Sequence, residues 1–147
     1  MRQITGFIGD ELGTHKITKS VEFCYGHRLL NYQGKCQHLH GHNGLVEVDV
    51  IGSRLDELGM VVDFGLVRDL IKGWIDANLD HRMLLCQDDP IVPILEDMGE
   101  PMFVMESNPT AEAISKLIYQ EANKQGLNVS EVRLWESNSS HATYSET

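Results

Sequence analysis

The sequence predicts an α+β domain in which two helices cover one face of an antiparallel sheet of about four strands. Lys16–Tyr25 and His40–Ile51 alternate apolar with polar residues, as half-buried strands do. Two later stretches, which start at Phe64 and Thr110, carry apolar residues at helical spacing. A last strand is expected over Val129–Glu136, so the order is hairpin, helix, helix, strand.

The first half of the chain predicts the hairpin and the first helix. Met1–Thr14 shows little periodicity, and no function can be read from it. A loop from His27 to Leu39 joins the first two strands, and Met60–Asp63 is briefly apolar and extended. The first helix is expected to run from Phe64 to about Asn78, with the carboxylate that precedes it as its N-cap.

The second half predicts a long connection before the second helix. Cys86–Asn108 contains three prolines and reads as irregular, with one short helical turn around Ile91–Met98. Such a connection is often functional or oligomeric. Thr110 is expected to begin a helix that ends near Gly126, and its hydroxyl could be no more than the helix cap.

Composition limits the classes of function. A chain of 147 residues is about one domain, and the expectation is a single domain over residues 1–147. The net charge of −10 argues against nucleic acid as a partner but allows a small anionic ligand in a locally positive pocket. Three cysteines without paired spacing, and no signal-like or long apolar segment, indicate a reduced cytoplasmic setting and no membrane. Cys24 and Cys86 are expected to be buried small hydrophobes.

Four of the seven histidines lie within Phe23–His42, which is the predicted working centre of the chain. Residues i and i+2 of an extended chain project from one side, so His40 and His42 can reach one ion. His42 opens the apolar face of its strand, and His27 continues the apolar face of the first strand. Three imidazoles with one open position match a catalytic zinc site. The alternative is a chance pair of surface imidazoles.

Other chemically active residues surround this centre and leave alternatives open. Cys36 could be a fourth ligand of a closed structural site, or a free thiol whose pKa a nearby metal lowers from about 8.5. Asp80 and His81 follow a helix end and suit a supporting role, or are only a helix-terminal charge. Glu136 ends an apolar strand face, where it would meet a ligand unless it lies beyond the sheet in water.

Together these residues resemble the 6-pyruvoyl-tetrahydropterin synthase family, and within it the 6-carboxy-tetrahydropterin synthases of queuosine biosynthesis. The resemblance extends from Lys16 to Tyr144, and three residues between Cys36 and His40 are similar to the spacing of carboxy-forming members. The motifs that carry it are His27-Arg-Leu29, Cys36-Gln-His-Leu-His40-Gly-His42, Gly59-Met-Val-Val-Asp63-Phe64, Leu79-Asp80-His81, Asn108-Pro-Thr110-Ala-Glu112 and Trp135-Glu136.

The resemblance implies a tunnel-forming fold (T-fold) that assembles as trimers and hexamers with sites at subunit interfaces. It implies 7,8-dihydroneopterin triphosphate as substrate and 6-carboxy-5,6,7,8-tetrahydropterin, acetaldehyde and triphosphate as products. The implied roles are zinc ligands (His27, His40, His42), proton acceptor (Cys36), its relay (Asp80, His81), and pterin binding (Glu136, assisted by Thr110). The rivals are a pyruvoyl-forming or related pterin side-chain lyase, and a non-catalytic zinc-bound assembly module.

Two features depart from the family pattern. Phe23-Cys24-Tyr25-Gly26 stands where small residues usually precede the first zinc histidine, and the connection from Cys86 to Asn108 is long. Both bear on pocket shape and product identity. Candidates to meet the triphosphate are Lys16, Lys35, Arg28 and Arg82.

Overall fold

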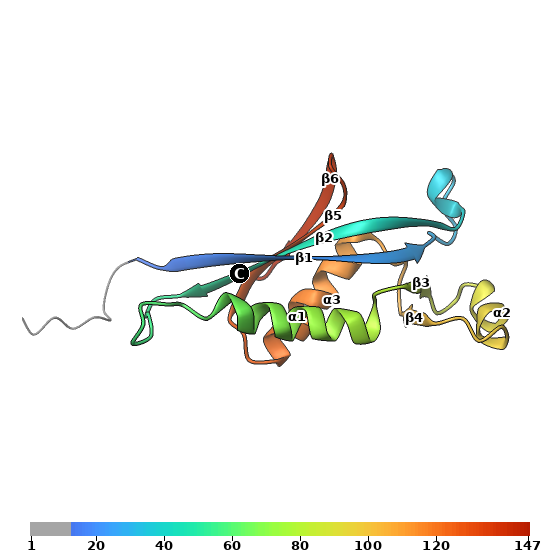
Figure 1. The fold of residues 1–147 in the computed structure, drawn as a ribbon. Helices are drawn as coiled ribbons and strands as arrows, with labels where there is room; N and C mark the ends of the chain where they lie inside the picture. The colour runs from blue at the N-terminus through green and yellow to red at the C-terminus, as the bar shows by residue number, and fades with distance from the viewer. Residues whose placement is uncertain (1–12) are drawn as a thin grey trace, which may run out of the picture.

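The computed structural model describes residues 13–147, so most of the Met1–Thr14 segment lies outside the described residues (Figure 1). Within this range one sheet has the strand order β4-β3-β1-β2-β5-β6. Its strands are β1 (His15–His27), β2 (His40–Gly52), β3 (Arg82–Cys86), β4 (Met102–Met105), β5 (Val129–Ser137) and β6 (Ser140–Ser145). The helices are η1 (Lys35–Gln37), α1 (Phe64–Asn78), α2 (Ile91–Asp97) and α3 (Ala111–Lys124).

The hairpin of β1 and β2 is the long central part of the sheet. The two strands pair antiparallel from His15 opposite Gly52 to His27 opposite His40. Their alternation buries one face, where Val46 and other core residues of β2 pack toward the helices. The register therefore places His27 of β1 beside His40 of β2, at the end of the hairpin far from His15.

The two predicted long helices are confirmed, and both lie on one side of the sheet (Figure 1). The carboxylate of Asp63 accepts hydrogen bonds from the N–H groups of Gly65 and Leu66, as the predicted N-cap of α1. The hydroxyl of Thr110 accepts one from the N–H of Ala113 and caps α3. The apolar stripes of both helices belong to the same buried core as the sheet.

The expected strand count and pairing are corrected by the structure. The sheet has six strands in the described range, and β3 pairs parallel with both β1 and β4. Met60–Asp63 is not a strand, because the Asp56 carboxylate and N–H bind the N–H and C=O of Met60 and close a turn. The strands β3 and β4 are short apolar runs without alternation, which periodicity does not distinguish from buried loop or helix.

The connection from Cys86 to Asn108 is more regular than expected. The predicted helical turn is present as α2, and β4 follows it. The closing residues, which showed no clear pattern in sequence, form β6, where Tyr144 packs edge-on against Tyr119 of α3 at 5.0 Å between ring centroids. Over residues 13–147, no helix combines the length and the apolar character that crossing a bilayer requires.

The sheet face opposite the helices holds a buried ion pair. Asp49 is 1% exposed, and its carboxylate accepts two hydrogen bonds from the Arg133 guanidinium, at 2.8 and 2.9 Å. The hydroxyl of Thr18 donates a third at 2.6 Å, and Lys16 Nζ lies 3.5 Å away. Hydrogen bonding by Arg133 is the main cause that lowers the pKa of Asp49 from 3.8 to about 2.

Candidate metal centre and pocket

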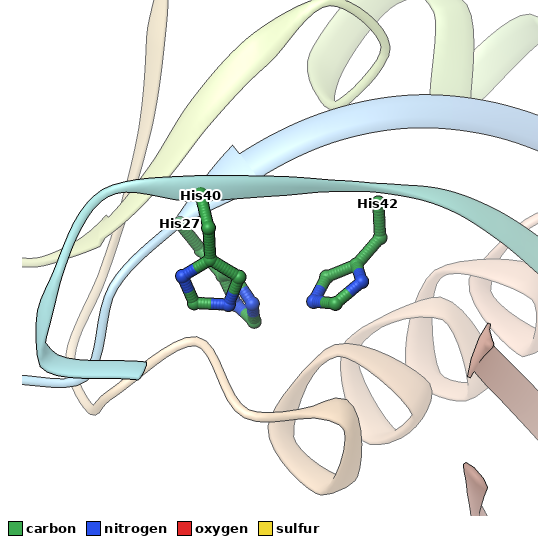
Figure 2. A group of neighbouring side chains, drawn as sticks. All are labelled: His27, His40 and His42. Atoms are coloured by element: carbon green, nitrogen blue, oxygen red, sulfur yellow. The ribbon is translucent and has the colours of Figure 1, made fainter. Parts of the chain in front are cut away.

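Three imidazoles converge at the end of the β1–β2 hairpin (Figure 2). His27 is the last residue of β1, while His40 and His42 project from one side of β2. One nitrogen from each ring lies within 4.8 Å of the other two. The predicted convergence is therefore confirmed, and the binding of zinc there stays a prediction.

The outer nitrogens of two of these rings are fixed by backbone carbonyls. His27 Nδ1 lies 2.7 Å from the carbonyl oxygen of Pro109, and His40 Nδ1 lies 2.7 Å from that of His38. A carbonyl only accepts, so each Nδ1 carries the proton and each Nε2 keeps its lone pair. Burial lowers the pKa of His27, which favours the neutral ring that a metal requires.

The Nε2 atoms of His27 and His40 are both buried and have no hydrogen-bond partner among the described residues. Leaving a buried polar atom without a partner costs free energy. Two unpartnered ring nitrogens, in a group of three imidazoles whose ligand atoms lie within 4.8 Å of one another, fit a divalent cation such as zinc.

Glu136 reaches the same place from β5. Its carboxylate oxygens lie 3.9 Å from Nε2 of His27 and 3.9 Å from Nε2 of His42. The Tyr25 hydroxyl lies 3.4 Å from the carboxylate, and burial, with the Glu136 charge, raises the pKa of Tyr25, so this hydroxyl donates. The side chain of Glu136 is 26% exposed, so the carboxylate borders the triad instead of lying in open water.

A pocket of about 330 Å³ opens beside the triad. Its lining includes His27, Cys36, Thr110 and Glu136. Cys36 lies on η1 and is partly exposed. Among the described residues, the ligand atoms that lie within 4.8 Å of one another belong to His27, His40 and His42, and the sulfur of Cys36 is not one of them. The thiol therefore shares the pocket but stands outside the group of three converging imidazole nitrogens.

Asp80 and His81 form a contacting pair in the turn between α1 and β3. Asp80 Oδ2 lies 2.8 Å from His81 Nδ1, and its other oxygen accepts the N–H of Cys24 at 3.0 Å. Burial alone would raise the pKa of Asp80, but these two hydrogen bonds, together with the charges of His81 and Lys72, outweigh it and lower that pKa. Among the described residues, the pocket that Cys36 lines does not include this pair, and His81 lines another pocket with Cys24.

The expectation for the two other cysteines is half right. Cys86 is buried, as predicted. Cys24 is exposed, because it projects from the sheet face opposite the core, between the inward residues Phe23 and Tyr25. Its thiol donates to the Asn43 amide oxygen at 2.9 Å.

Several supporting contacts had no sequence signal or only a partial one. The backbone carbonyls that orient the imidazoles leave no trace in side-chain patterns. The sequence placed Tyr25 on the inward face of its strand, as an unusually large residue before His27, but did not predict its contact with Glu136. Arg28, one candidate for the triphosphate, binds the buried carboxylate of Asp89, with Nε 2.7 Å from Oδ2.

These features define a class: an α+β protein with a three-histidine candidate metal centre, bordered by a carboxylate and a thiol-lined pocket. A sequence model of the 6-pyruvoyl tetrahydropterin synthase family matches residues 16–147. The chain belongs to this family of enzymes.

Curated relatives point in the same direction. The chain is 46% identical over 102 residues to a 6-carboxy-5,6,7,8-tetrahydropterin synthase of Rickettsia bellii, covering 68% of this chain and 74% of that protein. It is 35% identical over 159 aligned positions to the protein of the same name from Aquifex aeolicus, covering 89% and 98%.

Solved structures support the fold. An uncharacterized Wolinella succinogenes protein matches with a TM-score of 0.75 and 28% identity, covering 91% of this chain and 99% of that one. The 6-pyruvoyl tetrahydropterin synthase of Caenorhabditis elegans matches with a TM-score of 0.68 and 20% identity, covering 92% and 97%. The second likeness supports the T-fold alone.

Proposed function

We propose that this chain is a zinc-dependent 6-carboxy-5,6,7,8-tetrahydropterin synthase. The proposed substrate is 7,8-dihydroneopterin triphosphate, and acetaldehyde and triphosphate leave with the consumption of one water. The pathway is that of queuosine and other 7-deazapurines, in the cytoplasm. The observation that carries the proposal is the pair of buried, unpartnered Nε2 atoms beside a carboxylate and a thiol-lined pocket, in a chain whose relatives bear this name.

Each side chain of the pocket receives one role. His27, His40 and His42 would hold the metal, which would supply Lewis acidity toward the hydroxyls of the substrate side chain. Cys36 accepts a proton from a carbon of that side chain. Glu136 accepts hydrogen bonds from the N–H groups of the pterin ring, with help from Thr110 on the pocket wall. This contact holds the side chain of the pterin over the triad.

Asp80 and His81 are proposed to act from a neighbouring subunit. Within one chain His81 lines a pocket other than that of Cys36, and Asp80 contacts His81, so a relay to the thiol requires a second copy of the chain. A trimer or hexamer with interfacial sites supplies that copy. Mixed oligomers test this: Cys36→Ala and His81→Ala subunits, each inactive alone, should regain activity after joint refolding. Continued inactivity of correctly assembled mixed oligomers would contradict the shared site.

The product decides the type of reaction. Purified, zinc-loaded protein is incubated with 7,8-dihydroneopterin triphosphate, and the products are identified by mass spectrometry. Acetaldehyde and the 6-carboxy product support the proposal. A 6-pyruvoyl product would assign the chain to the rival lyase, and no turnover by a zinc-loaded oligomer would favour the non-catalytic module.

Cys36→Ala separates the enzyme from the zinc-bound module. If Cys36 is the proton acceptor, the variant keeps stoichiometric zinc and its fold and loses turnover. If the thiol is the fourth ligand of a structural site, the variant loses metal. Elemental analysis and circular dichroism of the same preparation distinguish the two outcomes.

A further inference from the structure

The three residues that follow His27 are each tied to a different part of the chain. The Arg28 side chain binds Asp89, and the N–H of Leu29 donates to the carbonyl of Cys36 at 2.8 Å. Leu30 is held at both of its backbone polar groups by the side-chain amide of Asn108. Its N–H donates to Oδ1 at 2.8 Å, and its C=O accepts from Nδ2 at 2.9 Å.

One amide side chain thus pairs with Leu30 as a neighbouring strand would. Leu29 and Leu30 share a rigid, planar peptide group, so the orientation that Asn108 gives to Leu30 constrains Leu29 as well. Leu29 in turn holds the backbone of Cys36. Two short contacts therefore connect Asn108 to the residue that carries the thiol.

The same turn also fixes the metal centre. Pro109, the next residue, accepts the Nδ1 proton of His27 at 2.7 Å, and Thr110 begins α3 as its cap. Three consecutive residues at the start of one helix hold the first imidazole, the loop of Cys36 and a wall of the pocket. The distance between the thiol and the triad is thus set from this single turn.

We propose that Asn108 is a positioning residue that places Cys36 for proton transfer. The inference rests on the proposed function for the role of the thiol. Asn108 is not among the residues that line the pocket, so it acts through Leu30 and Leu29 and touches no substrate. Without it, the loop from Arg28 to Leu39 loses its two bonds to the turn before α3.

The test compares Asn108→Ala with Asn123→Ala in the full-length, zinc-loaded protein. Asn123 makes a similar double contact near the other end of α3, with Oδ1 3.0 Å from the N–H of Val129 and Nδ2 3.5 Å from its C=O. Asn108→Ala should lower kcat about 10- to 100-fold, with little change in KM and in zinc content. Asn123→Ala should keep kcat, since its contact is remote from the pocket.

A conservative variant and a chemical probe complete the test. Asn108→Asp keeps the acceptor for the Leu30 N–H and should fall between Asn108→Ala and the unchanged protein. In a Cys24→Ser background, the rate at which iodoacetamide alkylates Cys36 should rise several-fold in Asn108→Ala, because the thiol is no longer held. Alkylation does not require turnover, so it tests the positioning even if the proposed reaction is wrong.

Two results would overturn the inference. One is equal kcat in the Asn108→Ala and Asn123→Ala variants, with equal Cys36 alkylation rates. The other is a loss of zinc in the folded Asn108→Asp variant that accounts for its whole loss of activity, since the residue would then serve the metal centre and not the thiol. If Asn108→Ala does not fold, the comparison is made with Asn108→Asp alone.

Discussion

Neutralising Asp49 should remove a defined part of the stability, and that part should depend on acid pH. A pKa of about 2 in the fold, against an ordinary value of 3.8, corresponds to about 2.4 kcal/mol of unfolding free energy near neutrality. Two observations reduce this figure. Within residues 13–147 both long helices lie on the other side of the sheet (Figure 1), so water screens part of the ion pair, and Arg133 keeps a second carboxylate, Glu131, at 3.2 Å. We expect Asp49→Asn to cost about 1 to 2 kcal/mol.

The sign follows from the direction of the pKa shift. A carboxyl group with a lowered pKa stabilises the fold above its unfolded pKa and loses that effect as the pH falls through its folded pKa. The stability advantage of the unchanged protein over Asp49→Asn should therefore be complete near neutrality and shrink between pH 3.8 and about 2.

Urea unfolding of metal-free protein, at one protein concentration and at several pH values, measures this advantage. Asp69→Asn is the matched control, because Asp69 pairs with Arg68 on the exposed surface and should contribute little at any pH. An advantage that stays constant from neutrality to about pH 2 would refute the assignment of the effect to the charge of Asp49.

Three further predictions follow from the site and from α1. His40→Ala should abolish stoichiometric zinc in elemental analysis. His38→Ala keeps the backbone carbonyl that orients His40 and should retain zinc. Equal zinc in both variants would contradict the assignment of His40 as a metal ligand. Tyr25→Phe removes the hydroxyl that faces the carboxylate beside the triad, so KM for the pterin should rise about fivefold with zinc retained. Tyr144→Phe, which breaks a contact of 2.7 Å between Tyr144 of β6 and Glu146, should leave KM unchanged, and a rise in both variants would refute the local effect. Gly73→Ala should raise stability in urea by about 0.5–1 kcal/mol, because the added methyl meets no atom within 4 Å on α1; a loss would contradict this open environment.

The long elements were predictable because their signals are local. The period of α1 and the carboxylate of Asp63 lie within one stretch of sequence, and the helix begins at Phe64 and ends at Asn78 as expected. The strands β3 and β4 depend on pairing with residues far away in the chain: Arg82 to Leu84 pair with Tyr25 to His27. Such short apolar runs acquire their strand character only from the assembled sheet.

The candidate site shows the same division. Strand parity was enough to predict that three imidazoles converge, because alternation in a strand is a local rule. The contact between Asp80 and His81 was not predictable, since adjacent side chains diverge in a strand. His81 has a φ of 57°, outside the strand and helix regions, so the rule does not apply to it. The carbonyls that select the tautomers belong to distant backbone, which no residue pattern reports.

Strand β1 positions two chemical groups at once. Tyr25 and His27 project from its inward side. The N–H of Cys24 donates to the Asp80 carboxylate, and the C=O of Cys24 accepts from the N–H of His81. Because side chains alternate with a period of two, inserting one residue between Cys24 and His27 would turn the imidazole outward while the acid–imidazole pair stayed in place. The number of residues between Cys24 and His27 is therefore fixed by the site. Surface connections such as the one after β2 tolerate changes of length more readily.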